Sequence, residues 1–329
     1  MPKLSVIVPV YNSEEEIRDC LDSLVEQTEQ DIEIIIIDDK STDNSLEIVK
    51  SYGRKYPNIR IYQNEQNLGQ GETRNRGIEI ATGDYIAFLD SDDYINPGMY
   101  QELLQAAEKY NNPELITTGV VFVKTSGYRQ ENFSEMAKGV PKVVHPKEEK
   151  EEIFNESPSL CNKIFRKDMV KGYKILDCMF EDAAFSFTRF LEADTVVEVP
   201  THNYFYRRDI TSGVSAQNFQ DNGHIDEIFR VADEIGDELQ RKGLYDYFES
   251  EIRRLQIAIC LQRVDEIDYW QATQERKNEV KAHMFETIYH RYGSLEGLDD
   301  IPVQCKAGFK VVDEYNDFTT KEAKKSVRK

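Results

Sequence analysis

YIAFLDSDD, residues 85–93, is the stretch that decides how this chain of 329 residues is interpreted. An apolar run with bulky side chains ends abruptly at three carboxylates, Asp90, Asp92 and Asp93. The apolar run predicts a buried strand. Three like charges at its end are costly unless a cation or a ligand lies among them. Asp and Ser also favour turns, so the stretch alone fits either a charged turn or a ligand site.

The composition predicts a folded and strongly acidic protein. Hydrophobic residues make up 40% of the chain, enough for a core, and the length suggests about two domains. The 41 basic and 61 acidic residues give a net charge of −20. This balance argues against nucleic acid as a partner, because a phosphate backbone needs a basic surface. A small anionic ligand stays open, because a metal or a few cations can invert the field inside one cleft.

The cysteines and the chain start predict a cytoplasmic protein. Five widely spaced cysteines without a C-x-x-C pair predict reduced thiols, not a disulfide frame or a zinc site. A strand pattern follows Met1 almost at once and leaves no room for a signal peptide, and no eighteen apolar residues are consecutive. The basic tail at 321–329 allows peripheral contact with the inner face of the membrane, although a solvated chain end is the simpler interpretation.

The first part of the chain alternates strand and helix patterns. Apolar runs predict strands at 4–10, 32–37, 59–62 and 84–89. Amphipathic segments between them predict helices, the first opened by a capping box of Ser13 and Glu16. This alternation predicts an α/β fold, a mostly parallel sheet flanked by helices on both faces.

Ligand-type residues follow three of these strands. They occupy positions 9–12, 38–39 and 90–93. Ligands of such sheets bind beyond the carboxyl ends of the strands, so we expect the three groups to meet at one edge.

The remaining sequence predicts two domains. Further helices and strands are expected at 99–110, 115–123, 181–191 and 195–199, with an irregular polar excursion at 124–150. Long helical patterns with charged faces follow, as at 247–264 and 270–292. We place an α/β domain at 1–215 and a helical C-terminal domain at 216–329.

Several familiar site chemistries do not fit. The G-x-G at 69–71 lacks its third glycine, where Arg74 stands, and does not follow the first strand, which argues against a Rossmann dinucleotide site. The chain has neither a P-loop nor a G-x-S-x-G nucleophile elbow. A carboxylate-rich site without thiolates suits Mg²⁺ or Mn²⁺, held by one or two carboxylates and substrate phosphates.

Glu181 and Asp182 offer the general base that such a site needs. A metal that bridges a diphosphate makes it a good leaving group, and a separate base must then activate the acceptor. The two acids stand at the head of a predicted helix. They also fit a purely electrostatic role there, because acids stabilise a helix N-terminus.

Taken together, these motifs resemble the family 2 glycosyltransferases, a group of mostly inverting, nucleotide-sugar-dependent enzymes with the A-type, Rossmann-like glycosyltransferase fold. The resemblance covers about residues 3–215 and is carried by six segments in order, 6–12, 37–43, 67–69, 74–77, 83–93 and 181–182. It implies that residues 1–215 are a catalytic domain. It also implies transfer of a sugar, with UDP the expected nucleotide, to an acceptor hydroxyl with inversion, in cell-surface polysaccharide or glycan synthesis.

The resemblance implies a nucleotide site. Pro9, Val10 and Tyr11 would line the pocket, with Tyr11 stacking near the base. Asp39 would accept a hydrogen bond from the uracil ring nitrogen. Arg74 would lie near the nucleotide and its phosphates, unless it is a surface charge of its helix.

The resemblance also implies a metal and a base. Asp90 would contact the ribose or a metal-bound water, and Asp92 would bind the Mg²⁺ or Mn²⁺. His202 matches a late residue that relatives supply to the metal or the diphosphate, unless it faces solvent. Asp182 would deprotonate the acceptor hydroxyl, with Glu181 as a further donor or acceptor contact.

Three further positions bear on the resemblance. Asn162 and Lys163 are similar to a pair that recurs in relatives with polysaccharide products, where Lys163 would contact the donor diphosphate or the acceptor. An ordinary pair at a strand edge explains them equally well. Lys40 stands where many relatives have glycine, so the loop after Asp39 differs from theirs.

Two alternatives remain open at this stage. A sugar-nucleotide nucleotidyltransferase usually carries a glycine-rich, lysine-bearing loop after its first strand, where this chain has residues 9–13. A catalytically inactive assembly subunit would work through the acidic helical region, although all the expected acids are present. The expected partners are a nucleotide sugar and a glycan or lipid-linked acceptor, and the C-terminal helices allow a homo-oligomer.

Overall fold

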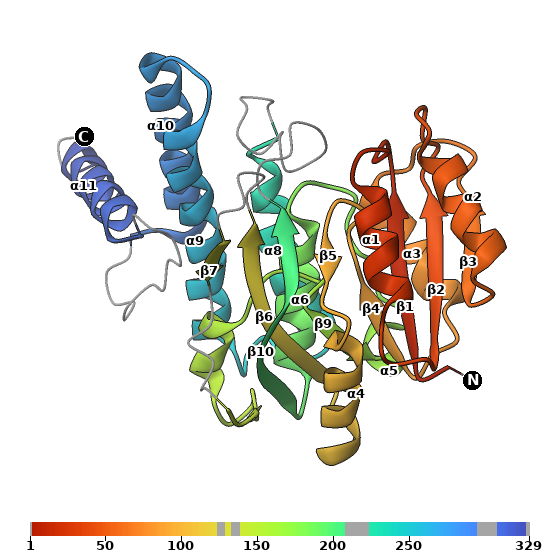
Figure 1. Ribbon diagram of the computed structural model, residues 1–329. Helices are drawn as coiled ribbons and strands as arrows, with labels where there is room; N and C mark the ends of the chain where they lie inside the picture. Colours follow the sequence, from red (N-terminus) through yellow and green to blue (C-terminus); the bar gives the residue numbers. More distant parts are fainter. Residues whose placement is uncertain (1, 124–128, 133–138, 208–223, 295–307, 327–329) are drawn as a thin grey trace. The chain divides into compact units, whose positions relative to one another are not determined.

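The computed structural model describes residues 2–123, 129–132, 139–207, 224–294 and 308–326. The chain divides into two units, Met1–Gly213 and Val214–Lys329 (Figure 1). The first unit contains the sheet, and the described elements of the second unit are helices. The assignment of functions to the two parts stays a prediction.

In the described part of the first unit, ten strands form one mixed sheet. Its strands are β1 (Leu4–Val10), β2 (Ile32–Asp38), β3 (Ile59–Gln63), β4 (Tyr85–Phe88), β5 (Tyr94–Ile95), β6 (Leu115–Val123), β7 (Arg129–Asn132), β8 (Lys142–Val144), β9 (Lys163–Arg166) and β10 (Val196–Arg207). The order is β3-β2-β1-β4-β9-β6-β10-β5, with β7 beside β6 and β8 beside β10.

The strand directions confirm a mostly parallel sheet. β1 pairs in parallel with β2 and β4, β2 with β3, and β6 with β10. β9 runs antiparallel between β4 and β6, so these two neighbours of β9 run in the same direction. Within the described residues six strands therefore run one way, and the shorter β5, β7, β8 and β9 run the other way.

Helices flank the sheet (Figure 1). They are α1 (Ile17–Val25), α2 (Ser45–Lys55), α3 (Gln70–Ile80), α4 (Met99–Lys109), α5 (Lys167–Val170) and α6 (Glu181–Glu192), with a 3₁₀ turn η1 (Lys150–Asn155). All seven residues of β1 and of β2 are buried. Burial at every position, instead of at alternate ones, means that both faces of these strands are covered.

The structure corrects the sequence prediction for the stretches 124–150 and 195–207. The strand predicted at 195–199 continues as β10 to Arg207, through register shifts between Val199 and His202 and between His202 and Tyr204. Pro200 lies in the first of these irregularities, as expected for a residue without an N–H to donate to the ladder. In the predicted excursion, β8 pairs with β10, and the described part of this stretch is therefore not wholly irregular.

The second unit is helical. It contains α8 (Glu227–Arg241), α9 (Glu249–Glu266), η2 (Ile267–Tyr269), α10 (Gln274–Tyr292) and α11 (Gly308–Ser326). Tyr315 on α11 is fully buried and donates a hydrogen bond from its hydroxyl to the carbonyl of Gly293, 2.7 Å away, just beyond α10. Among the described helices of both units, none is long and apolar enough to cross a membrane.

Glu33 joins the amino ends of neighbouring strands in the first unit. This residue of β2 is only 8% exposed. Its carboxylate accepts hydrogen bonds from the Ser5 hydroxyl at 2.6 Å, from the backbone N–H of Thr82 at 2.6 Å and from Arg60 Nη1 at 2.8 Å. Burial by itself raises the pKa of Glu33, but the hydrogen bonds from Ser5, Thr82 and Arg60 outweigh it and lower the pKa to about 2.

We expect Glu33 to make the protein acid-sensitive. Its pKa falls from 4.5 to about 2 on folding, so the carboxylate stabilises the fold above pH 4.5 and this contribution disappears as the pH falls toward 2. Allowing for partial screening, the contribution is about 2 kcal/mol. Urea unfolding of Glu33→Gln should give a lower free energy of unfolding than that of the wild type near neutral pH. As the pH falls to about 3, the free energy of unfolding should decrease less in the variant than in the wild type.

Glu79→Gln, at an exposed position of α3, is the matched control and should keep the wild-type acid loss. An equally steep acid loss in Glu33→Gln and in the wild type would contradict the assignment.

Candidate functional site

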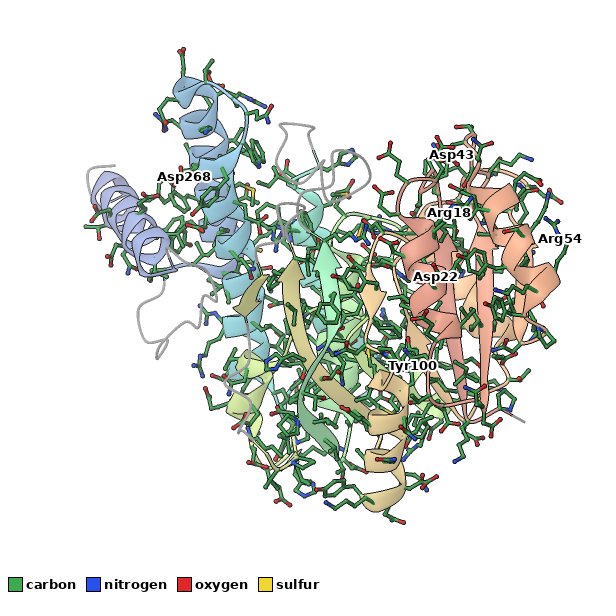
Figure 2. All side chains as sticks on the ribbon, in the orientation of Figure 1. Arg18, Asp22, Asp43, Arg54, Tyr100 and Asp268 are labelled. Atoms are coloured by element: carbon green, nitrogen blue, oxygen red, sulfur yellow. The ribbon has the colours of Figure 1, made fainter. Side chains whose placement is uncertain are left out.

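The loops after β1, β2 and β4 interlock at one edge of the sheet. The hydroxyls of Ser13 and Ser91 lie 2.7 Å apart, which joins the first loop to the third. The backbone N–H of Ser13 donates to Ser45 Oγ at 2.8 Å, and Asn12 Oδ1 accepts from the N–H of Thr42 at 2.8 Å. The structure thus brings together the three strand ends that carry ligand-type residues. Asp43, labelled in Figure 2, accepts from the N–H of Glu14 across the same junction.

The predicted capping box of Ser13 and Glu16 is wrong. Helix α1 begins at Ile17, after Glu16, without a side-chain cap. The Ser13 hydroxyl instead bonds to Ser91 and to the carbonyl of Tyr11. A partner in another loop outcompetes the local cap, and sequence spacing gives no sign of this.

Asp39 organises the loop that leads into α3. The residue follows β2 and is 3% exposed. Its Oδ1 accepts from Asn64 Nδ2 at 2.6 Å and from the N–H of Leu68 at 2.9 Å, and its Oδ2 accepts from the N–H of Gly69 at 2.9 Å. The N–H of Asp39 donates to the carbonyl of Val10 at 2.7 Å. Oδ2 therefore keeps room for one further donor, such as a ring N–H.

The predicted pocket residues of β1 differ in exposure. Pro9 and Val10 are buried, whereas the ring of Tyr11 is 47% exposed. An exposed aromatic side chain beside Asp39 offers a stacking surface for a base. The pocket role of all three residues stays a prediction.

Arg74 joins two of the predicted acids. It lies on α3 and is 3% exposed, so it is not a surface charge. Its Nη2 donates to Asp90 Oδ1 at 2.6 Å, and its Nη1 donates to Glu181 Oε1, which also accepts from Gln70 Nε2 at 2.8 Å. Burial lowers the pKa of Arg74, but the charges of Asp90 and Glu181 outweigh it and raise the pKa well above its usual value.

Glu181 and Asp182 are adjacent but lie in different surroundings. Glu181 is 2% exposed, and burial raises its pKa to about 7 against the opposing charge of Arg74. Asp182 is partly exposed, and its Oδ1 accepts from the N–H of Ala183 at 2.9 Å. Phe180, just before them, has a left-handed φ of 67°. Such a backbone costs about 1–3 kcal/mol in a residue other than glycine and is often found at functional sites.

The three acids after β4 also divide by environment. Asp93 is fully buried and accepts from the Tyr204 hydroxyl and, at 2.8 Å, from the N–H of Arg207. Asp92 is partly exposed, and burial together with the charge of Asp90 raises its pKa to about 7. Asp93 thus holds β10 against the loop, whereas the surroundings of Asp92 are those that a bound cation would relieve.

The sequence matches Glycosyl transferase family 2 over residues 5–177, more than half of the chain. The chain belongs to this family. The prediction of the family is thereby confirmed. Curated relatives agree with it: the uncharacterized glycosyltransferase YibD of Escherichia coli K12 is 51% identical over 105 residues, which are 32% of this chain and 30% of that protein.

Two further relatives are similar over a longer part of the chain. The poly(ribitol-phosphate) beta-glucosyltransferase of Bacillus spizizenii is 35% identical over 213 residues, 62% of this chain and 32% of that protein. The "Putative glycosyltransferase EpsH" of Bacillus subtilis is 33% identical over 220 residues, which are 64% of this chain and 62% of that protein. The chain thus spans about a third of the first two relatives and less than two thirds of the third.

Solved structures confirm the predicted A-type fold of family 2. Staphylococcus aureus TarS 1-349 in complex with UDP has a TM-score of 0.65 at 21% identity and covers 98% of this chain and 92% of its own. The mannosyltransferase PcManGT of Pyrobaculum calidifontis, in complex with GDP-Man and Mn²⁺, has a TM-score of 0.50 at 14% identity, covering 96% and 87%. Likeness at these identities shows the fold.

The backbone of Lys40 adopts a conformation that glycine favours. Its φ is 63°, in the left-handed region that favours glycine. Asn12, in the loop that faces it, has a φ of 48°. Both turns at this edge of the sheet thus hold a side chain in a backbone conformation that a glycine would adopt without strain.

His202 lies within β10, not at its end. It pairs with Gly119 of β6, where a Cβ on Gly119 would come within 2.6 Å of the imidazole Cδ2. Arg207, at the end of the strand, contacts the acid loop through its backbone N–H, which donates to Asp93, and its guanidinium pairs with Asp19. Metal binding by His202 stays a prediction.

Asn162 and Lys163 are buried at the start of β9. The Lys163 ammonium has no exposed surface, pairs with Glu156 at 2.7 Å and donates to the carbonyls of Ser157 at 2.8 Å and Ser159 at 2.7 Å. Asn162 Oδ1 accepts from the same ammonium at 3.0 Å. A contact between Lys163 and a donor or acceptor, which stays a prediction, would require these bonds to open.

The donor set fits the predicted Mg²⁺ or Mn²⁺ only in part. In the part of the chain that the structure describes, no group of three or more His, Cys, Asp or Glu side chains is arranged to hold a metal. A hard cation in such enzymes takes one or two carboxylates and completes its shell with phosphate oxygens and water. Asp92, with its raised pKa beside Asp90, fits that limited role.

We expect Asp92→Ala to weaken the binding of UDP in the presence of Mn²⁺ by about tenfold or more, because the metal loses a protein ligand. UDP binding without metal should change little. Isothermal titration calorimetry with UDP, with and without Mn²⁺, measures both.

Asp84→Ala is the matched control, because Asp84 is exposed just before the opposite end of β4 and should leave both affinities unchanged. Equal affinity of the wild type for UDP with and without Mn²⁺ would remove the metal from the assignment.

Proposed function

We propose that this chain is an inverting glycosyltransferase that moves a sugar from a UDP-sugar to an acceptor hydroxyl. One observation carries the proposal: a single buried guanidinium, that of Arg74, binds both Asp90 and Glu181. Asp92 lies two residues from one of these carboxylates, and Asp182 is adjacent to the other. A donor-side acid and a base are thereby held at the same edge of the sheet, as a displacement between two substrates requires.

In the proposed reaction, the Asp182 carboxylate accepts the proton of the acceptor hydroxyl. The acceptor oxygen forms a bond to the anomeric carbon while the bond from that carbon to the diphosphate oxygen breaks, and its electron pair leaves with UDP. A single in-line displacement inverts the anomeric centre. Mg²⁺ or Mn²⁺ held by Asp92 would stabilise the negative charge of the departing diphosphate.

Asp182 is a better candidate for the base than Glu181. Asp182 is partly exposed, so an acceptor hydroxyl can reach it, whereas Glu181 is 2% exposed and bonded to Arg74 and Gln70. A general base must come within hydrogen-bond distance of the proton that it removes. Glu181, through its bonds to Arg74 and Gln70, would instead hold the backbone of the adjacent Asp182 in place.

Relatives support the choice of substrates. Staphylococcus aureus TarS, 32% identical over 216 residues, is a poly(ribitol-phosphate) beta-N-acetylglucosaminyltransferase, and its structures hold UDP and UDP-GlcNAc. With the Bacillus spizizenii enzyme, this favours a UDP-sugar donor and a cell-surface polymer or its lipid-linked precursor as acceptor. A cytoplasmic location, contact with the inner face of the membrane and a homo-oligomer stay predictions.

A donor screen tests the proposal directly. Thermal shift with UDP-, GDP- and CDP-sugars, each with and without Mn²⁺, should give the largest rise in melting temperature for a UDP-sugar with the metal. A preference for GDP- or CDP-sugars would reject UDP. Release of pyrophosphate from UTP and a sugar phosphate would point to a nucleotidyltransferase, and UDP binding without turnover of any sugar nucleotide would point to an inactive subunit.

We expect Asp182→Asn to lower turnover of the selected UDP-sugar by ~10²-fold or more, because the amide cannot accept the proton. The affinity for UDP with Mn²⁺ should remain nearly that of the wild type. Coupled assay of UDP release and calorimetry measure the two quantities.

Asp194→Asn serves as the control, because Asp194 is 73% exposed beyond the other end of α6. Wild-type turnover in Asp182→Asn would remove Asp182 from the mechanism.

A further inference from the structure

We propose that Arg74 is a positioning residue, which sets the base helix α6 relative to the donor loop after β4, and not a ligand of the donor phosphates. This inference rests on the proposed function. The guanidinium joins segments that are far apart along the chain: Glu181 is 107 residues from Arg74, and Asp90 is 16 residues from it. Each terminal nitrogen of the fork holds one of the two carboxylates.

Burial argues against direct contact with phosphate. Arg74 is 3% exposed, and an arginine that captures a diphosphate normally presents its planar fork to the ligand. Here both ends of the fork are bonded to protein carboxylates. A phosphate could take their place only by leaving Glu181 buried without its charged partner, which is costly.

The charge balance around Arg74 also argues against a contact with phosphate. One guanidinium, with a single positive charge, faces two carboxyl groups, those of Asp90 and Glu181. The carboxylate of Asp90 alone is enough to neutralise this charge. An approaching diphosphate would therefore meet no net positive field from this cluster. Arg74 has the surroundings of a structural bridge.

The rest of α3 binds the segment that leads into the base helix. Asn75 and Ile175 exchange two hydrogen bonds, from Asn75 Nδ2 to the Ile175 carbonyl at 2.9 Å and from the Ile175 N–H to Asn75 Oδ1 at 2.8 Å. A Cβ on Gly71 would lie 2.1 Å from the carbonyl oxygen of Leu176. The chain before α6 thus packs directly on the first turns of α3.

The same helix is tied to the donor side of the site. Asp39 accepts from the backbone N–H groups of Leu68 and Gly69 at the entry to α3, and Asp90 binds Arg74. A Cβ on Gly69 would lie 2.1 Å from Asp177 Oδ1. Close packing against residues 176–177 therefore explains the two glycines of the G-x-G. The donor-side acids and the helix that carries the proposed base both contact α3.

The consequence for catalysis is geometric. Asp182 is adjacent to Glu181, so a shift of the bridge moves the proposed base relative to the bound donor. A displacement of about 1 Å in such an arrangement can reduce turnover by ~10²-fold without loss of binding. Arg74 should therefore affect kcat and leave the affinity for UDP almost unchanged.

Arg74→Lys separates the two roles. Lysine keeps the charge but replaces the two-pronged fork by one ammonium, which cannot hold both carboxylates in the observed geometry. We expect kcat for the selected UDP-sugar, measured as UDP release, to fall roughly 10- to 100-fold. The Kd for UDP with Mn²⁺, measured by calorimetry, should stay within about threefold of the wild type. A tenfold or larger increase in this Kd would overturn the proposal.

Glu181→Gln tests the bridge from its other end and does not remove the arginine. We expect kcat to fall and the Kd for UDP to stay constant, because Glu181 is 2% exposed and bonded to Arg74 and Gln70. Tighter UDP binding would mean that the released Arg74 reaches the phosphates, and would overturn the proposal. The double variant Arg74→Lys/Glu181→Gln should lose little more kcat than the more impaired single variant, because both changes break one interaction. Additive losses would show that Arg74 acts elsewhere.

Controls keep the outcomes distinct. Arg54→Lys changes an exposed arginine of α2, labelled in Figure 2, and should leave kcat and Kd unchanged. Circular dichroism and thermal melting show whether each variant folds, and Glu181→Gln decides the matter if Arg74→Lys does not fold. A wild type that neither binds UDP nor turns over a UDP-sugar would overturn the proposed function and with it this inference. An active wild type whose Arg74→Lys variant loses UDP affinity would overturn the inference alone.

Discussion

The bridge from Arg74 to Asp90 and Glu181 is the interaction on which the candidate site depends. A guanidinium with 3% exposure is stable only while its carboxylates stay in place. Removal of one partner from a buried ion pair typically costs about 3–5 kcal/mol, because an uncompensated charge remains. The bridge therefore stabilises the contacts among the end of β4, helix α3 and the head of α6. The arrangement of the site follows from the same contacts that stabilise the fold.

Two pairs of adjacent acids show the same difference in burial between their members. In Asp92–Asp93 and in Glu181–Asp182, one acid is buried and bonded to the fold, and its neighbour is partly exposed. Asp93 is bonded to β10, and Glu181 to α3. The buried acid gives the exposed one a rigid backbone, and its bonds to donors limit the repulsion between the two carboxylates. Rigid support of this kind is what a reacting group needs in order to meet its substrate.

Much of the fold followed from local patterns in the sequence. Apolar runs at β1, β2 and β4 predicted buried strands, and polar residues at their ends predicted a shared edge, because parallel strands of one sheet end on the same side. The length of β10 could not be predicted, because its continuation past Pro200 depends on pairing with β5 and β6. The prediction of a capping box at Ser13 was wrong for a similar reason, because the Ser13 hydroxyl is hydrogen-bonded to Ser91, 78 residues away.

The sequence by itself determined the family, the sheet and the candidate acids, because strand periodicity and strand-end chemistry are properties of short segments. Only the tertiary structure decided which acid of each pair is buried, that Arg74 is enclosed between two carboxylates, and that Lys163 has no exposed surface. The physical reason is that burial and pairing depend on distant partners, as with Arg74 and Glu181, which are 107 residues apart. Spacing along the chain carries no information about such contacts.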